Sequence, residues 1–140
     1  MKRIIFVLAL IICNLSINAQ EKRFDYVKFR IDLHKYIVSE AHLTQAEADK
    51  FFPLYDEMKN KQRSLHRQIR ALIRQKPSSD AACRTAIVKR DGIEVQMKQL
   101  ESKYHEKFLK VISPSKLYDV LDAEGRFHRQ TFEKTIRKGR

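Results

Sequence analysis

The chain has 140 residues, enough for one domain, and its 29 Lys and Arg residues against 17 Asp and Glu give a formal net charge of +12. It is 43% hydrophobic and 33% charged, with only three glycines, three prolines and no tryptophan. Because turn-forming residues are so scarce, the composition argues against a fold with many tight turns and is typical of long helices in a coiled coil or bundle.

The first twenty residues differ from the rest. Lys2 and Arg3 precede an unbroken apolar run at residues 4–12, and Ala19 is a small residue at a possible cleavage point. The run is too short to span a hydrocarbon layer of about 30 Å. We therefore predict a cleaved secretory signal peptide, residues 1–19, and a periplasmic location.

Export determines how the charge and the cysteines are interpreted. Loss of the signal peptide leaves a single domain, residues 20–140, with a net charge of about +10. Outside the cytoplasm, this excess favours acidic proteins, exposed chains or membrane surfaces rather than nucleic acid. Cys13 suggests a lipoprotein box only loosely, because Ile12 is not small. Cys83 then has no internal partner, so it is either buried or free to pair between chains.

Apolar residues at helical spacing predict a first helix over residues 24–40, followed by a short break at Ala41 and His42. Its main apolar residues are Phe24, Val27, Ile31 and Val38.

A second helix is predicted to begin at Thr44. The Thr44 hydroxyl can accept a hydrogen bond from the backbone N–H of Glu47, and the Glu47 carboxylate can accept one from the N–H of Thr44. Leu43 before the cap can pack back on Ala48 as a hydrophobic staple. The helix is expected to run to about Lys76, after which Pro-Ser-Ser ends it.

Two faces of this second helix carry different residues. Its packing seam for another helix consists of Phe51, Tyr55, Met58, Gln62, Leu65, Ile69 and Leu72. Arg63, Arg67, Arg70 and Arg74 fall on the opposite face, at about 100° per residue, and with Lys59 they form the predicted client- or partner-binding surface. The alternative is that these arginines only keep the face soluble.

Pro53 interrupts the second helix early. Proline removes one backbone hydrogen bond and crowds the carbonyl one turn before it, so a bend is predicted near residues 48–52. The aromatic residues around it can offset that cost by being buried.

A third helix is predicted from Ser79 or Asp80 to about Val111. Only a short loop separates it from the second helix, which makes the two antiparallel neighbours. Its seam includes Ala86, Ile93, Met97, Leu100, Tyr104, Phe108 and Val111.

A fourth helix is predicted to begin at Ser113, an N-cap followed by Pro114 at the first helical position. Ile112 can pack on Leu117 as a staple, but Lys116 stands where a capping-box acid would be, so the reciprocal hydrogen bond is missing. The apolar stripe of this helix comprises Leu117, Val120, Leu121, Phe127, Phe132 and Ile136.

The two helix starts, Leu43-Thr44-x-x-Glu47 and Ile112-Ser113-x-x-Lys116, lie about seventy residues apart in a basic chain that is predicted to be exported. In this pairing, and in the Phe-Phe-Pro-Leu-Tyr phrase at residues 51–55, the chain resembles the LTxxQ-motif family of periplasmic proteins, the Spy/CpxP group. Glu47 and Lys116 depart from the family's glutamines, and only Glu47 can complete a capping box.

The resulting fold prediction is all-α, with four long, kinked helices in an elongated helical hairpin arrangement. The resemblance implies a cradle-shaped dimer with a basic, partly apolar concave face. It also implies ATP-independent holding of unfolded proteins, or sensing of envelope stress or of metal through a signalling partner.

No residue pattern for catalysis or metal binding accompanies these features. The histidines form no His-x-x-x-His pair, no Cys-x-x-Cys is present, and phosphate loops and nucleophile motifs are missing from the sequence. We therefore expect neither enzyme activity, nor a cofactor, nor a metal site. The five histidines are His34, His42, His66, His105 and His128.

The function expected from the sequence is a homodimeric holding chaperone for unfolded or acidic client proteins, with no nucleic-acid partner. The alternative is a regulatory protein that docks to a membrane sensor or an anti-sigma partner and responds to envelope stress or metal.

Overall fold

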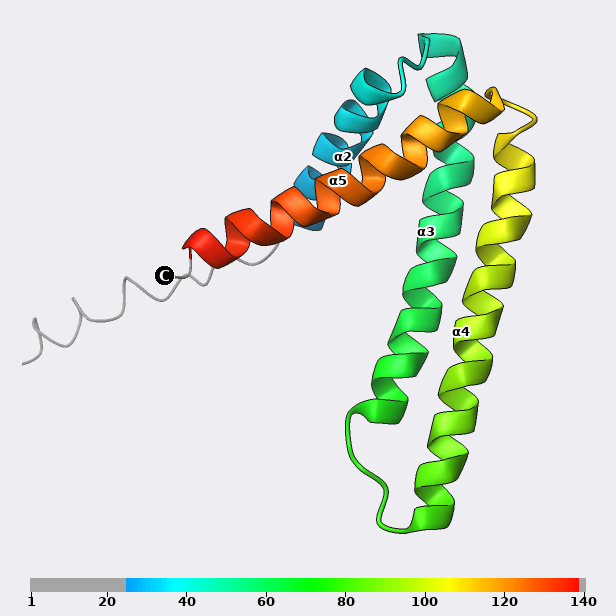
Figure 1. The fold of residues 1–140 in the computed structure, drawn as a ribbon, viewed down its shortest axis with the longest axis vertical. Coiled ribbons are helices and arrows are strands. Elements are labelled where there is room, and N and C mark those ends of the chain that lie inside the picture. Colours follow the sequence, from blue (N-terminus) through cyan, green and yellow to red (C-terminus); the bar gives the residue numbers. More distant parts are fainter. Residues whose placement is uncertain (1–24, 139–140) are drawn as a thin grey trace, which may run out of the picture. The chain divides into compact units, whose positions relative to one another are not determined.

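The computed structural model describes residues 25–138, and these residues form an all-α fold without a strand. The predicted fold class is confirmed at this level. Figure 1 labels the helices α2 (Tyr26–Glu40), α3 (Gln45–Ile73), α4 (Asp80–Phe108) and α5 (Pro114–Lys138).

The chain divides into two units, residues 1–32 and 33–140. In the first unit, the described part is the start of α2, where Asp25 accepts a 3.0 Å hydrogen bond from the backbone N–H of Lys28 and so caps the helix. Lys28 also pairs with Asp32 one turn later, at 2.9 Å. The predicted signal peptide lies outside the described residues.

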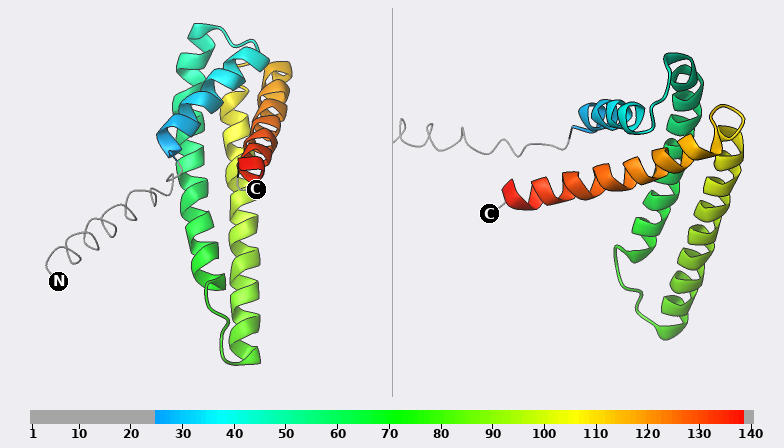
Figure 2. Two further views of the ribbon diagram at one scale, coloured as in Figure 1. Left: turned by 90° about the vertical axis from the view of Figure 1, so that its left-hand side faces the viewer. Right: turned by 45° about the horizontal axis from the view of Figure 1, so that its top comes forward.

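In the second unit, α3 and α4 lie side by side and are joined by the segment 74–79, as the views in Figures 1 and 2 agree. Their aromatic residues meet in the core, where the rings of Phe51 and Phe108 are 4.7 Å apart. The buried seam residues are Phe51, Tyr55 and Met58 of α3 and Met97, Tyr104 and Phe108 of α4. This part of the predicted seams is confirmed.

The later half of α2 and the first half of α5 extend this core at the end of the α3–α4 pair that contains residues 109–113. Tyr36 of α2 contacts Phe127 of α5 with ring centroids 5.5 Å apart, and Glu40 pairs with Arg126 at 2.7 Å. The buried residues contributed here are Leu33, Ile37, Leu117, Val120 and Ala123.

Two helix ends come earlier than the sequence predicts. α3 ends at Ile73 rather than near Lys76, since a residue that precedes proline disfavours the helical conformation. α4 ends at Phe108 rather than near Val111, because the N–H groups of Val111 and Ile112 both bond to the Phe108 carbonyl and close a tight turn.

Both predicted helix caps are present. At α3, the Thr44 N–H donates to Glu47 at 2.8 Å and the Glu47 N–H donates to the Thr44 hydroxyl at 3.3 Å, which completes the capping box. At α5, the Ser113 hydroxyl accepts from the N–H of Lys116 at 3.3 Å. The break between α2 and α3 holds His42 at φ 48°, and the Leu43 N–H reaches the Val38 carbonyl at 3.1 Å, the 6→1 bond of a Schellman motif.

Candidate functional site

The tight packing of α3 against α4 stops at a polar contact between the two helices. Gln62, 8% exposed, donates a 2.9 Å hydrogen bond to Glu101 of α4. Beyond it, between residues 63 and 96, no side chain is buried. We call residues 63–96 the open segment, which comprises the ends of α3 and α4 that are joined by the loop 74–79 (Figure 1).

The seam residues of the open segment remain half-exposed. Leu65, Ile69 and Leu72 of α3 continue the heptad pattern of the core, yet none of them is buried. A shallow hollow of about 600 Å³ runs along this seam, and Leu72 and Ile93 form part of its lining. A Cβ built on Gly92, which also lines the hollow, would meet no atom within 4 Å, so the glycine leaves open space rather than a close helix contact.

Three of the four predicted arginines lie together at the end of α3, where they line a hollow separate from the one along the seam. Arg67, Arg70 and Arg74 are exposed and, with Ala71 and Ile73, line a second hollow of about 540 Å³. Arg63 is half-buried, and its guanidinium donates to the Asn60 side chain one turn earlier.

The seam pattern does not predict the exposed aliphatic residues of this segment, because it assigns apolar residues only to seam positions. Their exposed fractions lie between 56% and 62%. A helical projection of α4 could have separated them from its seam. They are Ile73, Ile87, Val88 and Val95.

The open segment is also strongly basic. It contains eight Lys and Arg residues and three Asp and Glu residues, a net charge of +5 in 34 residues. No Phe, Tyr or Trp occurs between residues 56 and 103. The segment therefore offers cations and aliphatic side chains, and the imidazole of His66 is its only aromatic ring.

Lys59, the fifth predicted binding residue, lies in a different environment. Its ammonium pairs with Glu124 of α5 and lies 5.2 Å from the centre of the Tyr55 ring. Burial raises the pKa of Glu124, but His128, at 3.6 Å, and the paired Lys59 ammonium outweigh it, and the pKa falls to about 2. Burial and the nearby Glu124 raise the pKa of Tyr55.

The two motif starts meet in space. The Lys116 ammonium lies 2.6 Å from the Glu47 carboxylate, so the residue that cannot complete its own capping box pairs with the acid of the other box. The hydrogen bonds from Lys116 and from the Thr44 N–H lower the pKa of Glu47. Leu43 and Ile112, which precede the two caps, are both buried. The Glu47–Lys116 ion pair thus joins the start of α3 to the start of α5.

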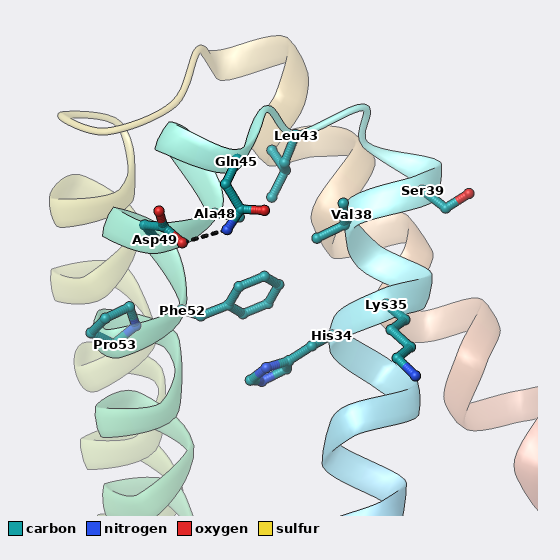
Figure 3. A pocket seen from close by; sticks show the side chains of 10 residues that line it. All are labelled: His34, Lys35, Val38, Ser39, Leu43, Gln45, Ala48, Asp49, Phe52 and Pro53. Atoms are coloured by element: carbon teal, nitrogen blue, oxygen red, sulfur yellow. Dashed lines mark hydrogen bonds between the residues drawn. The ribbon is translucent and has the colours of Figure 1, made fainter.

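A further hollow of about 580 Å³ lies between the later half of α2 and the start of α3. Figure 3 shows the side chains of Phe52 and His34 next to each other in its lining, and their rings stack with centroids 4.0 Å apart. His34 also lies 3.0 Å from Asp56. Pro53, at the rim, is exposed within an unbroken α3, and the predicted bend stays a prediction.

Among residues 25–138, no three His, Cys, Asp or Glu side chains lie together as a metal site would require. Cys83 is half-buried near the start of α4, with its thiol 3.5 Å from the Pro77 carbonyl. No helix in the same range is long and apolar enough to cross a membrane.

Comparison with models of known protein families, with curated proteins and with solved structures found no match. The resemblance to the LTxxQ-motif family therefore stays a prediction, based on the motif residues alone.

Proposed function

We propose that the protein is a periplasmic, ATP-independent holding chaperone that binds unfolded or aggregation-prone proteins on its open segment. The proposal includes the kinked, hairpin-like arrangement and the cradle-shaped dimer that the resemblance to the Spy/CpxP group implies.

The observation that carries the proposal is the combination of aliphatic exposure and positive charge in the open segment. The side chains of Ile73, Ile87 and Val88 are exposed. The open segment that contains them also has eight Lys and Arg residues. Cations attract acidic or exposed chains over several ångströms and raise the encounter rate, and apolar contacts then slow release.

The shape of the open segment favours clients of many kinds over one fixed ligand. Its two hollows, of about 600 and 540 Å³, are shallow and lined in part by long side chains such as Gln68, Lys89 and Arg70. Long flexible side chains adapt to different surfaces and cover apolar atoms when no client is bound. A loose site of this kind suits transient holding.

The test is suppression of client aggregation, followed by light scattering at low and at high salt. The wild-type protein should suppress aggregation and capture its client more slowly at high salt, because salt screens the attraction. Ile87→Ser with Val88→Ser should weaken suppression several-fold. Val27→Ser with Ile31→Ser removes two comparably exposed aliphatic residues outside the open segment and should leave suppression unchanged. Equal effects of the two pairs, or no suppression by the wild type, would refute the proposal.

The second candidate is a regulatory protein that docks to an acidic sensor domain or anti-sigma partner, and the net charge of +5 in the open segment favours it. In that case the wild-type protein would leave generic clients unprotected and would bind one acidic partner with a fixed stoichiometry. Isothermal titration with the candidate partner would then give a saturable 1:1 curve that Arg67→Gln with Arg70→Gln weakens.

A further inference from the structure

Three exposed arginines near the end of α3 share one hollow. Arg67, Arg70 and Arg74 line the hollow of about 540 Å³, together with Ala71 and Ile73. Among residues 25–138, none of the three arginines has a hydrogen bond or an ion pair. They follow one another at steps of three and four residues, so their side chains leave successive turns of the helix on one side. The hollow therefore concentrates positive charge that the described residues do not neutralise.

The sequence around the hollow provides no negative charge for these arginines. Residues 58–79 contain seven Lys and Arg residues and no Asp or Glu. Like charges one turn apart repel each other and weaken the helix. The negative end of the helix dipole offsets this repulsion for Arg70, in the last turn of α3, and for Arg74, at its C-cap, but Arg67 lies before that turn. An anion from outside the chain would compensate all three.

The side chains of the hollow indicate a phosphate group attached to an apolar body. A guanidinium group donates two parallel hydrogen bonds to phosphate oxygens, which makes arginine the residue best suited to hold this anion. Ile73, 61% exposed, adds an aliphatic side chain to the same lining. Acidic phospholipids combine the two features, because their phosphate groups lie directly above the acyl chains.

The hollow lies where the chain can meet a flat surface. Arg74 follows the last residue of α3, and the loop 74–79 closes the end of the α3–α4 pair that is opposite the start of α5 (Figures 1 and 2). The loop adds Lys76 and the start of α4 adds Arg84, and both side chains are exposed. We call residues 67–84 the basic end. An extended surface can approach it along the axis of the pair.

We propose that the basic end docks on a membrane surface that contains acidic phospholipids. Arg67, Arg70 and Arg74 hold the lipid phosphate groups, and Ile73 enters the headgroup layer beside them. This contact goes beyond client holding, because it needs no unfolded protein and keeps the chain at the membrane.

The first test is flotation of the mature protein, purified after export, with phosphatidylcholine vesicles that do or do not contain phosphatidylglycerol. The wild type should float only with the acidic vesicles, and less at high salt. Arg67→Gln with Arg70→Gln should weaken binding more than about tenfold, since each cation near an acidic surface contributes about fivefold. Arg129→Gln with Arg137→Gln is the matched control, because it removes two exposed arginines of α5 and should leave binding nearly unchanged. Equal losses in the two pairs, or a wild type that does not float, would overturn the proposal.

A second variant separates phosphate recognition from charge alone. Arg67→Lys with Arg70→Lys keeps both charges but replaces each planar fork of donors with a single ammonium group. Binding to acidic vesicles should fall several-fold, and unchanged binding would overturn the assignment of the phosphate groups to these arginines. Because the substituted side chains are exposed, circular dichroism should show all the variants folded.

The third test locates the contact with a polarity-sensitive fluorophore on a single cysteine, after Cys83 is replaced by serine. On Ser78→Cys, in the loop, its emission should shift to the blue when acidic vesicles are added. On Gln130→Cys, on α5, it should not shift; both positions are exposed. An equal shift at both positions, or none at position 78, would reject the docking. Aggregation assays without vesicles measure client holding separately, so the failure of one proposal can be told from the failure of the other.

Discussion

Replacement of Glu124 by glutamine tests how α3 and α5 are held together. Glu124 is 14% exposed on α5, pairs with Lys59 of α3 and lies beside the buried Tyr55. Glutamine keeps the size of the side chain but removes its charge. It leaves the Lys59 ammonium, 26% exposed, without its carboxylate.

The expected size of the effect follows from the pKa of Glu124, which is lowered from its ordinary 4.5 to about 2 on folding. Each unit between the folded and unfolded pKa corresponds to about 1.4 kcal/mol, so the full contribution to the free energy of unfolding is at most about 3 kcal/mol. Lys59 is partly solvated, and solvent screening reduces the expected contribution to about 2 kcal/mol.

The sign of the pH dependence is fixed by the direction of the shift. A carboxyl with a lowered folded pKa stabilises the fold above its unfolded pKa of 4.5 and loses that contribution as the pH falls toward 2, because the unfolded chain takes up the proton first. The difference in unfolding free energy between the wild type and Glu124→Gln should therefore be about 2 kcal/mol at pH 7 and less than half of that at pH 3.

Urea unfolding at pH 7, 5 and 3, followed by circular dichroism at about 222 nm, measures this difference. Glu133→Gln removes a carboxylate from an exposed position on the same helix and should match the wild type at all three pH values within about 0.5 kcal/mol. A constant difference between the wild type and Glu124→Gln from pH 7 to pH 3 would refute the ion-pair account. Equal losses in the Glu124 and Glu133 variants would refute it as well.

Three further changes test the helix starts and the bend. Glu47→Gln and Lys116→Gln should each lower the urea midpoint, whereas the double variant should lose less than the sum of the two, because paired amides can replace the 2.6 Å ion pair; strictly additive losses would contradict this. His42→Gly should raise the free energy of unfolding by about 1 kcal/mol, since φ 48° strains any residue with a Cβ, and an unchanged or lower value in the same urea assay would contradict it. Pro53→Ala should raise the free energy of unfolding by up to about 3 kcal/mol, and the melting temperature with it, because alanine restores a hydrogen bond inside α3; calorimetry showing a lower melting temperature would contradict it.

Local chemistry allowed the helices to be predicted from the sequence. Thr44 and Ser113 cap α3 and α5 where the motifs predict, and the seam residues Phe51, Tyr55 and Tyr104 are buried as expected. These features depend on spacing and on hydrogen bonds over three or four residues, which the sequence contains directly.

Long-range pairings could not be predicted in the same way. The sequence alone makes Lys116 a defect in its own motif, because nothing in it places Lys116 beside Glu47, 69 residues away. The position of Lys59 on the helix places it with the arginines, and only the three-dimensional packing of α5 gives it Glu124 as a partner. Similarly, the α3 seam has the same heptad pattern on both sides of Gln62, so the pattern alone could not show where burial stops.

The most direct test of client holding on the open segment is site-specific photo-crosslinking to an unfolding client. A photoreactive amino acid would replace Ile87 in the open segment or, as the control, Gln130 on α5; both positions are exposed. The proposed function predicts strong crosslinking to the client from position 87, reduced by high salt, and little from position 130. Equal yields at the two positions, or none at position 87, would contradict the assignment of client binding to the open segment.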